Sequence, residues 1–238
     1  MIQVVVITDN RSLYTKFKQK IATLSIQNVA FTYYCSKGNS KLFDNEIEEI
    51  ILKNDYHHIL ENSQLVISLH CQQIFPVALI TKVRCINIHP GLNPHNRGWY
   101  PHIFGIINGT PAGATIHEMD EEIDHGAIIA SKQIAVYSWD TSETLYKRIT
   151  EAELQLIEEN IENIINNTYV AVPVIDEGNY NSKNDFKKLC EIDMNKVGTF
   201  EQFYNTLRAL SFTGYNNAWF TDQDGNKIYL NLKVVKEE

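Results

Sequence analysis

Short apolar runs alternate with segments of helical hydrophobic spacing through the first half of the chain. Gln3–Thr8 is continuously apolar and β-branched apart from its first residue, and Leu13–Leu24 repeats its apolar residues at helical intervals. Short apolar runs are typical of strands that are buried on both faces of a parallel sheet. This order predicts an α/β fold, a Rossmann-like open and mostly parallel sheet built from right-handed βαβ units. Further strands are predicted at Val29–Tyr34, Leu65–Leu69 and Val83–Ile88, and a second helix around Ile47, Ile50 and Ile51.

The second half of the chain begins with two more strand patterns and then a long helix. Ala112–His117 and Ala127–Val136 are predicted to be strands on either side of a turn at Asp124. Asp140 and Glu143 resemble a capping box, and the apolar residues after them recur on one helical face. We therefore predict a helix packed on the sheet, with Leu145, Ile149, Ala152, Leu156, Ile161 and Ile164 on its buried face.

The chain changes character after Pro173. Through Asn195 it is polar and rich in turn-forming residues. We therefore expect three parts: a main domain of residues 1–170, a linker of residues 171–198 along the surface, and a small carboxyl-terminal subdomain of residues 199–238.

The carboxyl-terminal subdomain is predicted to be a short helix followed by a β-hairpin appendage. The helix covers Phe200–Leu210, and the hairpin joins Ala218–Thr221 to Lys227–Val235 around Asp224 and Gly225. The second strand alternates polar and apolar residues, so one of its faces should be buried, and a lone two-stranded hairpin is marginal in water. We expect a homodimer in which this face is covered by a second copy; the alternative is that it folds back onto its own chain. The apolar residues of this face are Ile228, Leu230, Leu232 and Val234.

Composition narrows the class of protein. The chain has 238 residues, of which 44% are hydrophobic and 21% charged, as is ordinary for soluble globular proteins. No apolar run approaches the roughly 20 residues that span a bilayer. Met1–Val4 is interpreted as the start of a strand and not as a signal peptide. We expect a cytoplasmic protein with no membrane partner.

Charge and cysteine spacing exclude further classes. A net charge of −8 disfavours a nucleic-acid partner, because such proteins usually carry a basic patch. Thr8–Arg11 stands where a dinucleotide-binding protein has its glycine-rich turn, so a nicotinamide cofactor is disfavoured. The cysteines show no CxxC spacing and are expected to be reduced, without a zinc site or disulfide framework. They are Cys35, Cys71, Cys85 and Cys190.

Polar and titratable residues gather between Asn87 and Gly126, where five of the eight histidines lie. Asn87 and His89 share one side of a strand end, because side chains alternate with period two. They should project into the crevice at the carboxyl edge of the sheet, to which Asp124 could return. An amide, an imidazole and a carboxylate suit acyl transfer, and with no Ser or Cys beside them they indicate attack by a substrate amine. The alternative is that all three are ordinary turn and capping residues. With no HxxxH or HxH pair in this segment, no metal is expected.

Four motifs in this segment carry a family resemblance. They are Asn87-Ile88-His89-Pro90-Gly91-Leu92, Arg97-Gly98, Gly113-Ala114-Thr115-Ile116-His117 and Ile123-Asp124-His125-Gly126. In combination they resemble the formyltetrahydrofolate-dependent formyltransferases, which include glycinamide ribonucleotide transformylase, methionyl-tRNA formyltransferase and the sugar N-formyltransferases. The resemblance covers about the first 170 residues. It implies Asn87, His89 and Asp124 as the catalytic residues, 10-formyltetrahydrofolate as co-substrate and no metal.

The loop from Asn93 to Pro101 is similar to that of enzymes that formylate nucleotide-linked amino-dideoxy sugars. The acceptor that this similarity favours is dTDP-4-amino-4,6-dideoxyglucose, whose sugar occurs in O-antigen and other surface polysaccharides. The alternative acceptors are its 3-amino relatives. The alternative functions are formyltetrahydrofolate hydrolysis and a catalytically inactive binding module. Leu207–Leu210 through Ala218–Phe220 resembles the start of the carboxyl-terminal domain of the tRNA enzyme. The remaining residues are too few for that domain's OB barrel, so tRNA is not expected as a substrate.

The resemblance also implies binding residues. Around the co-substrate these are Gln72, Gln73, Ile74, Phe75, Asp120 and Asp124. Around the sugar nucleotide they are Asn10, Asn93, Arg97, Gly98, Trp99, Tyr100, Phe212 and Tyr215. Simpler alternatives remain for some: a surface ion pair for Arg97, core packing for Trp99 and Tyr100, and a helix-entry loop for 72–76.

Overall fold

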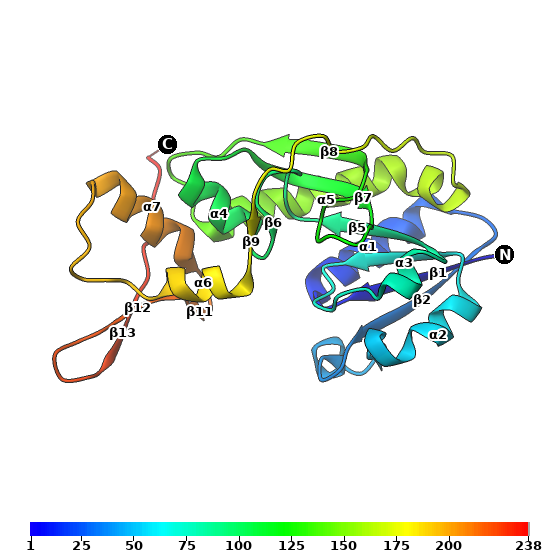
Figure 1. Cartoon of the computed structure of the whole chain (residues 1–238), viewed down its shortest axis with the longest axis horizontal. Helices are drawn as coiled ribbons and strands as arrows, with labels where there is room; N and C mark the ends of the chain where they lie inside the picture. The colour runs from blue at the N-terminus through cyan, green and yellow to red at the C-terminus, as the bar shows by residue number, and fades with distance from the viewer. Residues whose placement is uncertain (238) are drawn as a thin grey trace.

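Seven strands form one sheet in the structure, a computed structural model that describes residues 1–237. The strand order is β3-β2-β1-β4-β5-β7-β8 (Figure 1). The first five of these are parallel, and β7 and β8 are antiparallel to their neighbours. The predicted Rossmann-like, mostly parallel sheet is confirmed. In chain order its strands are β1 (Ile2–Thr8), β2 (Val29–Ser36), β3 (Glu48–Ile50), β4 (Leu65–Leu69), β5 (Arg84–His89), β7 (Ala112–Glu118) and β8 (Ile128–Ile134).

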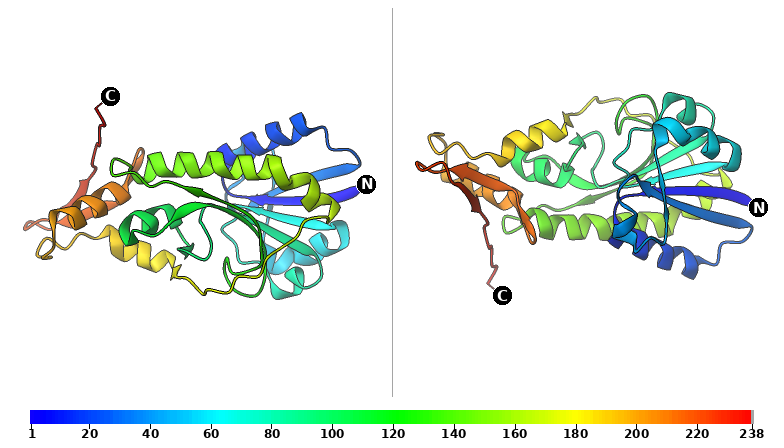
Figure 2. Two further views of the ribbon diagram at one scale, coloured as in Figure 1. Left: turned by 90° about the horizontal axis from the view of Figure 1, so that it is seen from above. Right: turned by 90° about the horizontal axis from the view of Figure 1, so that it is seen from below.

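Helices cover both faces of the sheet (Figure 2). One face packs against α1 (Arg11–Leu24) and the long α5 (Ser142–Asn166), and the other against α2 (Leu52–Asn62) and the short α3 (Val77–Ile80). Side chains of β1 alternate between these two cores, which is why the strand is apolar along almost its whole length.

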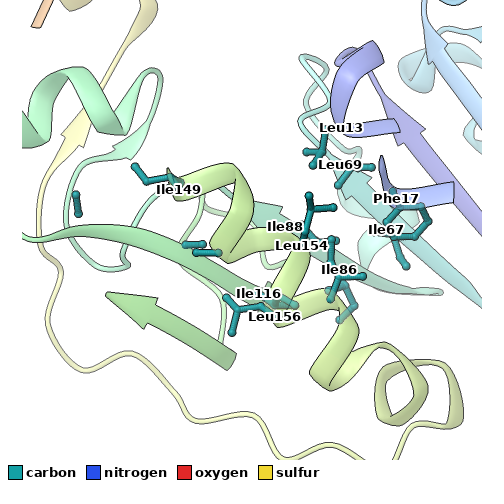
Figure 3. Packing of buried hydrophobic residues seen from close by; sticks show 14 of the residues in the cluster. Leu13, Phe17, Ile67, Leu69, Ile86, Ile88, Ile116, Ile149, Leu154 and Leu156 are labelled. Carbon is teal, nitrogen blue, oxygen red and sulfur yellow. The ribbon is translucent and has the colours of Figure 1, made fainter. Parts of the chain in front are cut away.

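The larger core lies between the sheet and helices α1 and α5 (Figure 3). It includes side chains that are fully buried, such as Phe17, and removing one of them would cost about 2–5 kcal/mol. This core fixes the position of β4 and β5, whose carboxyl ends carry polar residues. Its labelled members are Leu13, Phe17, Ile67, Leu69, Ile86, Ile88, Ile116, Ile149, Leu154 and Leu156.

The start of α5 differs from the prediction. Thr141 is the N-cap, and it exchanges hydrogen bonds with Thr144 in a capping box. Asp140 does not cap the helix, because its carboxylate accepts hydrogen bonds from the Tyr137 amide at 2.7 Å and from Arg148. The predicted helix is confirmed, but the residues that begin it were predicted wrongly.

The second helix was also placed too early. Residues 48–50 form the edge strand β3, which pairs with Tyr34–Ser36, and α2 begins only at Leu52. The spacing of Ile47, Ile50 and Ile51 fits a helix, but ladder hydrogen bonds to β2 favour the extended conformation. Short apolar segments of this kind do not distinguish the two by pattern alone.

The segment predicted to be a linker contains regular structure. Helix α6 (Lys183–Cys190) begins with a capping box of Ser182 and Asp185. Just before it, β9 (Tyr180–Asn181) pairs with β6 (Arg97–Gly98). Residues 171–198 are therefore more ordered than their composition indicates. The boundaries proposed at 170 and 198 stay a prediction.

The carboxyl-terminal subdomain lies at the opposite end of the molecule from the amino terminus (Figure 1). It contains α7 (Phe200–Leu210) and the predicted hairpin of β12 (Ala218–Thr221) and β13 (Lys227–Leu230). Two short strands, β10 (Ser211–Phe212) and β11 (Tyr215–Asn216), lie between them. The second hairpin strand ends at Leu230 and not at Val235 as predicted. No helix within residues 1–237 is long and apolar enough to cross a membrane.

Candidate active site

The ends of two adjacent strands place the first polar side chains of the site. Asn87 and His89 lie on β5 in alternate positions, and both are buried. β7 pairs with β5 so that His117 lies opposite Asn87. The Asn87 Nδ2 group lies 3.3 Å from His117 Nε2. The antiparallel β7 thus adds a second imidazole to the carboxyl end of β5.

The turn after β7 brings Asp124 to the same place. Its Oδ1 accepts a hydrogen bond from Asn87 Nδ2 at 2.8 Å, and its Oδ2 accepts one from the Gly98 amide at 2.9 Å. His89 Nδ1 lies 3.5 Å from Oδ2, and His117 Nε2 lies 3.6 Å from Oδ1. Asp124 has a φ of 50°, a left-handed conformation that is uncommon for residues other than glycine. Residues Asn87, His89 and Asp124 therefore form one cluster.

Charge states in the cluster follow from burial and mutual contact. Burial lowers the pKa of His89 to about 4, and this outweighs the opposing effect of Asp124. Burial alone would raise the pKa of Asp124, but the neighbouring His89 and His117 and the Gly98 amide hold it well below its usual range. At neutral pH the cluster is therefore a carboxylate beside a neutral imidazole.

One nitrogen of His89 is free. Among residues 1–237, His89 Nε2 has no hydrogen-bond partner although it is buried. A Cβ at Gly91 would lie 2.4 Å from Nε2, so glycine leaves room beside this atom. Because Nδ1 lies 3.5 Å from the Asp124 carboxylate, we expect it to carry the ring hydrogen, which leaves the Nε2 lone pair able to accept a proton. This is the geometry of a general base oriented by a carboxylate.

The side-chain amide of Asn87 is already hydrogen-bonded within the protein. His117 Nδ1 lies 2.6 Å from the Glu118 carbonyl oxygen and donates to it, so Nε2 accepts from Asn87. Both amide hydrogens of Asn87 are then engaged, one by Asp124 and one by His117. A substrate oxygen would receive the hydrogen that His117 now accepts. His117 was quoted within a motif but not predicted as a site residue; its register position opposite Asn87 identifies it.

The residues predicted around the co-substrate have mixed positions. Gln73 binds the backbone of Leu52 and Ile50, and Phe75 is buried in the core, so both hold the loop in place. Ile74 is largely exposed, and the backbone amide of Gln72 donates a hydrogen bond to the Asp9 carboxylate at 2.7 Å. Asp120 lies on the Asp124 turn, 2.7 Å from His125. Their proposed binding roles remain predictions.

Several residues predicted around the sugar nucleotide meet at Tyr146 of α5. Asn10 donates to the Tyr146 hydroxyl at 2.8 Å, and the Phe212 ring lies 6.0 Å from the Tyr146 ring. Tyr215 contacts Phe212 with ring centres 5.4 Å apart. Phe212 and Tyr215 belong to the carboxyl-terminal subdomain, so this aromatic group joins it to the main domain. Tyr146 itself was not predicted, because it falls within a regular helix pattern.

Other members of that set face the surrounding loops. Arg97 donates a hydrogen bond to the Ile123 carbonyl oxygen at 3.3 Å. The carboxylates of Glu122 and Glu177 each lie 3.7 Å from the Arg97 guanidinium group. Asn93 Nδ2 donates to the Asp124 carbonyl at 2.8 Å, so it holds the catalytic turn, as Gly98 does.

The two aromatic residues after Gly98 lie against α6. The Lys183 Nζ atom lies 4.6 Å from the centre of the Trp99 ring. The ring centres of Phe186 and Tyr100 are 4.1 Å apart. Both aromatic rings thus help to hold helix α6 in place. Cys35, Cys71, Cys85 and Cys190 form no disulfide among residues 1–237.

Comparisons with known proteins agree with this geometry. Residues 3–161 match the family model described as Formyl transferase. The chain belongs to this family. Residues 185–236 match the model described as the N-formyltransferase dimerization C-terminal domain, which supports the predicted homodimer. Which residues form its interface stays a prediction. The family resemblance seen in the sequence is confirmed, and the protein is a formyltransferase.

Individual relatives in the family are similar over most of the chain. The chain is 46% identical over 180 residues to a dTDP-4-amino-4,6-dideoxyglucose formyltransferase from Mycobacterium tuberculosis, covering 76% of this chain and 77% of that protein. It superposes on a sugar N-formyltransferase from Shewanella with a TM-score of 0.96, at 40% identity and full coverage of both chains. A 4-N formyltransferase from Francisella tularensis gives a TM-score of 0.95 at 40% identity, with 99% of each chain covered.

Proposed function

We propose that this formyltransferase moves the formyl group of 10-formyltetrahydrofolate to the amino group of a nucleotide-linked amino-dideoxy sugar. dTDP-4-amino-4,6-dideoxyglucose is the acceptor that the relatives favour, because two of them are described as acting at a 4-amino group. The 3-amino isomer is the second candidate. A structure of the same fold from Helicobacter canadensis, 24% identical, was solved with folinic acid and dTDP-3-aminofucose, so this fold can hold both kinds of ligand.

The observation that carries the proposal is the free Nε2 atom of His89 beside Asp124. A neutral, buried imidazole with a free lone pair can take the proton that an amine loses as it bonds to the formyl carbon. It can then return this proton to the nitrogen that leaves. Asp124, held as a carboxylate, stabilises the transient imidazolium. These steps balance without a covalent intermediate on the protein, in keeping with the absence of a Ser or Cys side chain from the described cluster.

Asn87 supplies the polar donor of the cluster. Its amide hydrogen is available to the formyl oxygen once it leaves His117, and an amide donor stabilises negative charge that develops there. Removing one such donor typically lowers kcat by about 10²–10³. Asp124 keeps the other amide hydrogen and so fixes the orientation of the side chain.

The decisive experiment supplies 10-formyltetrahydrofolate with dTDP-linked 4-amino and 3-amino sugars and follows the products by mass spectrometry. We expect formylation of the 4-amino sugar, and loss of it in a His89→Asn variant. Formate release without any amino sugar would favour the hydrolase instead. Failure to formylate any amino sugar would overturn the proposal.

A further inference from the structure

A fully buried carboxylate on α5 has no part in the chemistry described so far. Glu153 is 0% exposed, and its Oε1 lies 2.7 Å from His70 Nε2. Its Oε2 has no partner within residues 1–237. Isolated carboxylates are rarely buried, because losing water disfavours the charged form. Burial raises the pKa of Glu153 even though His70 opposes this.

His70 holds this carboxylate at the edge of the active site. It follows β4 directly, and β4 pairs with β5 so that Leu69 lies beside Ile88. Since neighbouring strands are about 4.8 Å apart, His70 emerges next to His89. His70 has a φ of 58° and a side chain only 11% exposed. A left-handed, non-glycine residue at a strand end is held there by its surroundings.

The tautomer of His70 follows from Asn10. Asn10 is the N-cap of α1, and its Oδ1 accepts from the Leu13 amide at 3.0 Å. This fixes the amide so that its Nδ2 donor faces His70 Nδ1 at 3.3 Å. Nδ1 must then be the acceptor, and Nε2 carries the hydrogen that is donated to Glu153. His70 Nδ1 therefore presents its lone pair toward Asn10 and Tyr146, as in a histidine base oriented by a carboxylate.

Tyr146 lies between this lone pair and the residues predicted around the sugar nucleotide, such as Phe212. Its hydroxyl lies 3.3 Å from His70 Nδ1 and accepts from Asn10. Asn10, His70 and Tyr146 each keep some exposed surface, whereas Glu153 behind them has none. Phe212 flanks the Tyr146 ring. A ligand at the exposed part of this group would contact Asn10, His70 or Tyr146 and not Glu153.

We propose that Tyr146, His70 and Glu153 form a proton relay that converts the acceptor's ammonium group to the amine that attacks. This inference rests on the proposed function. An ammonium N–H bond breaks as its proton passes to the Tyr146 oxygen, while the Tyr146 proton passes to His70 Nδ1. The nitrogen keeps the electron pair, and the imidazolium formed is paired with the Glu153 carboxylate. The proton returns to solvent after the product leaves.

A relay of this kind supplies a step that His89 alone does not. Aliphatic amines are protonated at neutral pH, as lysine is, so two protons must leave the nitrogen before an amide exists. His89 handles the proton that ends on the leaving nitrogen, and the other needs a separate acceptor. The titratable groups around His70 are Glu153 and Tyr146 on α5, His89 on β5 and His102 on helix α4 (Pro101–Asn108).

The test is the pH dependence of kcat/KM for the amino sugar at saturating formyl donor. Tyr146→Phe, His70→Asn and Glu153→Gln should each lose about 10–100-fold at pH 6.5 but less than about threefold at pH 9, where the free amine is far more abundant in solution and can bind already deprotonated. Gln can still accept from His70 Nε2 but cannot balance an imidazolium. Glu151→Gln, a neighbouring exposed carboxylate paired with Lys16, is the matched control and should change neither value.

The outcomes separate the relay from the proposed function. Equal losses at both pH values would show a merely structural role and would overturn the relay, as would no loss. A wild-type enzyme that formylates no amino sugar would overturn the function instead. A measurement without substrate completes the test: the ¹⁵N NMR signals of His70, assigned with His70→Asn, should show a bare Nδ1 and a protonated Nε2 at pH 7. The opposite tautomer would rule out the relay.

Discussion

The carboxyl edge of the sheet buries polar side chains, whereas the carboxyl-terminal subdomain of residues 199–237 leaves large apolar ones exposed. At the sheet edge, polar groups such as His89 and His117 are almost completely buried and contact one another. In the subdomain, apolar residues remain open: Tyr215 is 61% exposed and Tyr229 is 47% exposed. One chain thus completes the polar cluster by itself but leaves the apolar surface uncovered. We expect association with a second copy to cover this apolar surface.

The strongest way to break the polar cluster is His89→Asn. We expect kcat to fall about 10²–10⁴-fold, because no group then takes the amine proton at Nε2. Asn is smaller than His and polar, so the fold and the dimer should persist, which circular dichroism and light scattering would check. Near-normal turnover in a folded variant would show that His89 is not the base.

Gly91→Ala tests the free space beside His89. The new methyl carbon would lie 2.4 Å from His89 Nε2 and 3.0 Å from the Pro101 Cβ, so the imidazole must move. We expect about a 10–100-fold loss of kcat/KM, since a small misplacement in a catalytic group is costly. Gly105→Ala is the control, because its Cβ would meet Ala112 at an ordinary 3.6 Å and should leave activity intact. Equal effects of the two substitutions would contradict this account.

The apolar surface is tested by ending the chain at Thr221, which removes β13. We expect light scattering to report a monomer, because β12 then loses its partner strand and the uncovered face is reduced. Tyr229→Asp, which keeps the hairpin and adds a charge, should weaken the dimer in the same direction. A truncated chain that stays a stable dimer would place the interface elsewhere in residues 185–236.

The smallest expected effect concerns acid stability of the polar cluster. Burial lowers the pKa of His89 to about 4 and that of His102 to about 3, whereas unfolded histidine titrates near 6.5. Between these values the unfolded chain binds more protons than the folded one, so the free energy of unfolding falls as pH drops below about 6.5. We expect each of the two histidines to contribute about 2 kcal/mol to this loss between pH 7 and pH 5 in urea titrations. His102→Gln should reduce that slope; an unchanged slope would show that His102 does not contribute.

The fold was largely predictable because the parallel strands are buried on both faces. β1 was predicted from residue 3 and begins at 2, and β4 was predicted with its exact bounds. Where a segment is exposed or at an edge, pattern alone failed, as for β3. The start of helix α6 has a capping-box motif, Ser182 and Asp185, that could have been recognised in the sequence. It was overlooked because the surrounding residues are polar and rich in turn-forming types.

The cluster of Asn87, His89 and Asp124 was predictable for a different reason. Alternation along a strand and the carboxyl-edge rule together placed Asn87 and His89, and the same rule applied to β4 would have indicated His70. Glu153 was not predictable, because its partner lies 83 residues away and a glutamate within a helix is usually solvated. Long-range burial of a charge leaves no local signal in the sequence.

The pairing of β6 with β9 determines where this protein can be divided. The Arg97 and Trp99 amides donate to carbonyls of Asn179 and Asn181, each at 2.9 Å, and the Gly98 amide between them holds Asp124. A fragment ending at residue 170 would keep Asn87, His89 and Asp124 but lose the strand β9 that pairs with this loop. Transplanting tails between related enzymes should therefore join the sequences after residue 181, so that the loop and its supporting strand are inherited together.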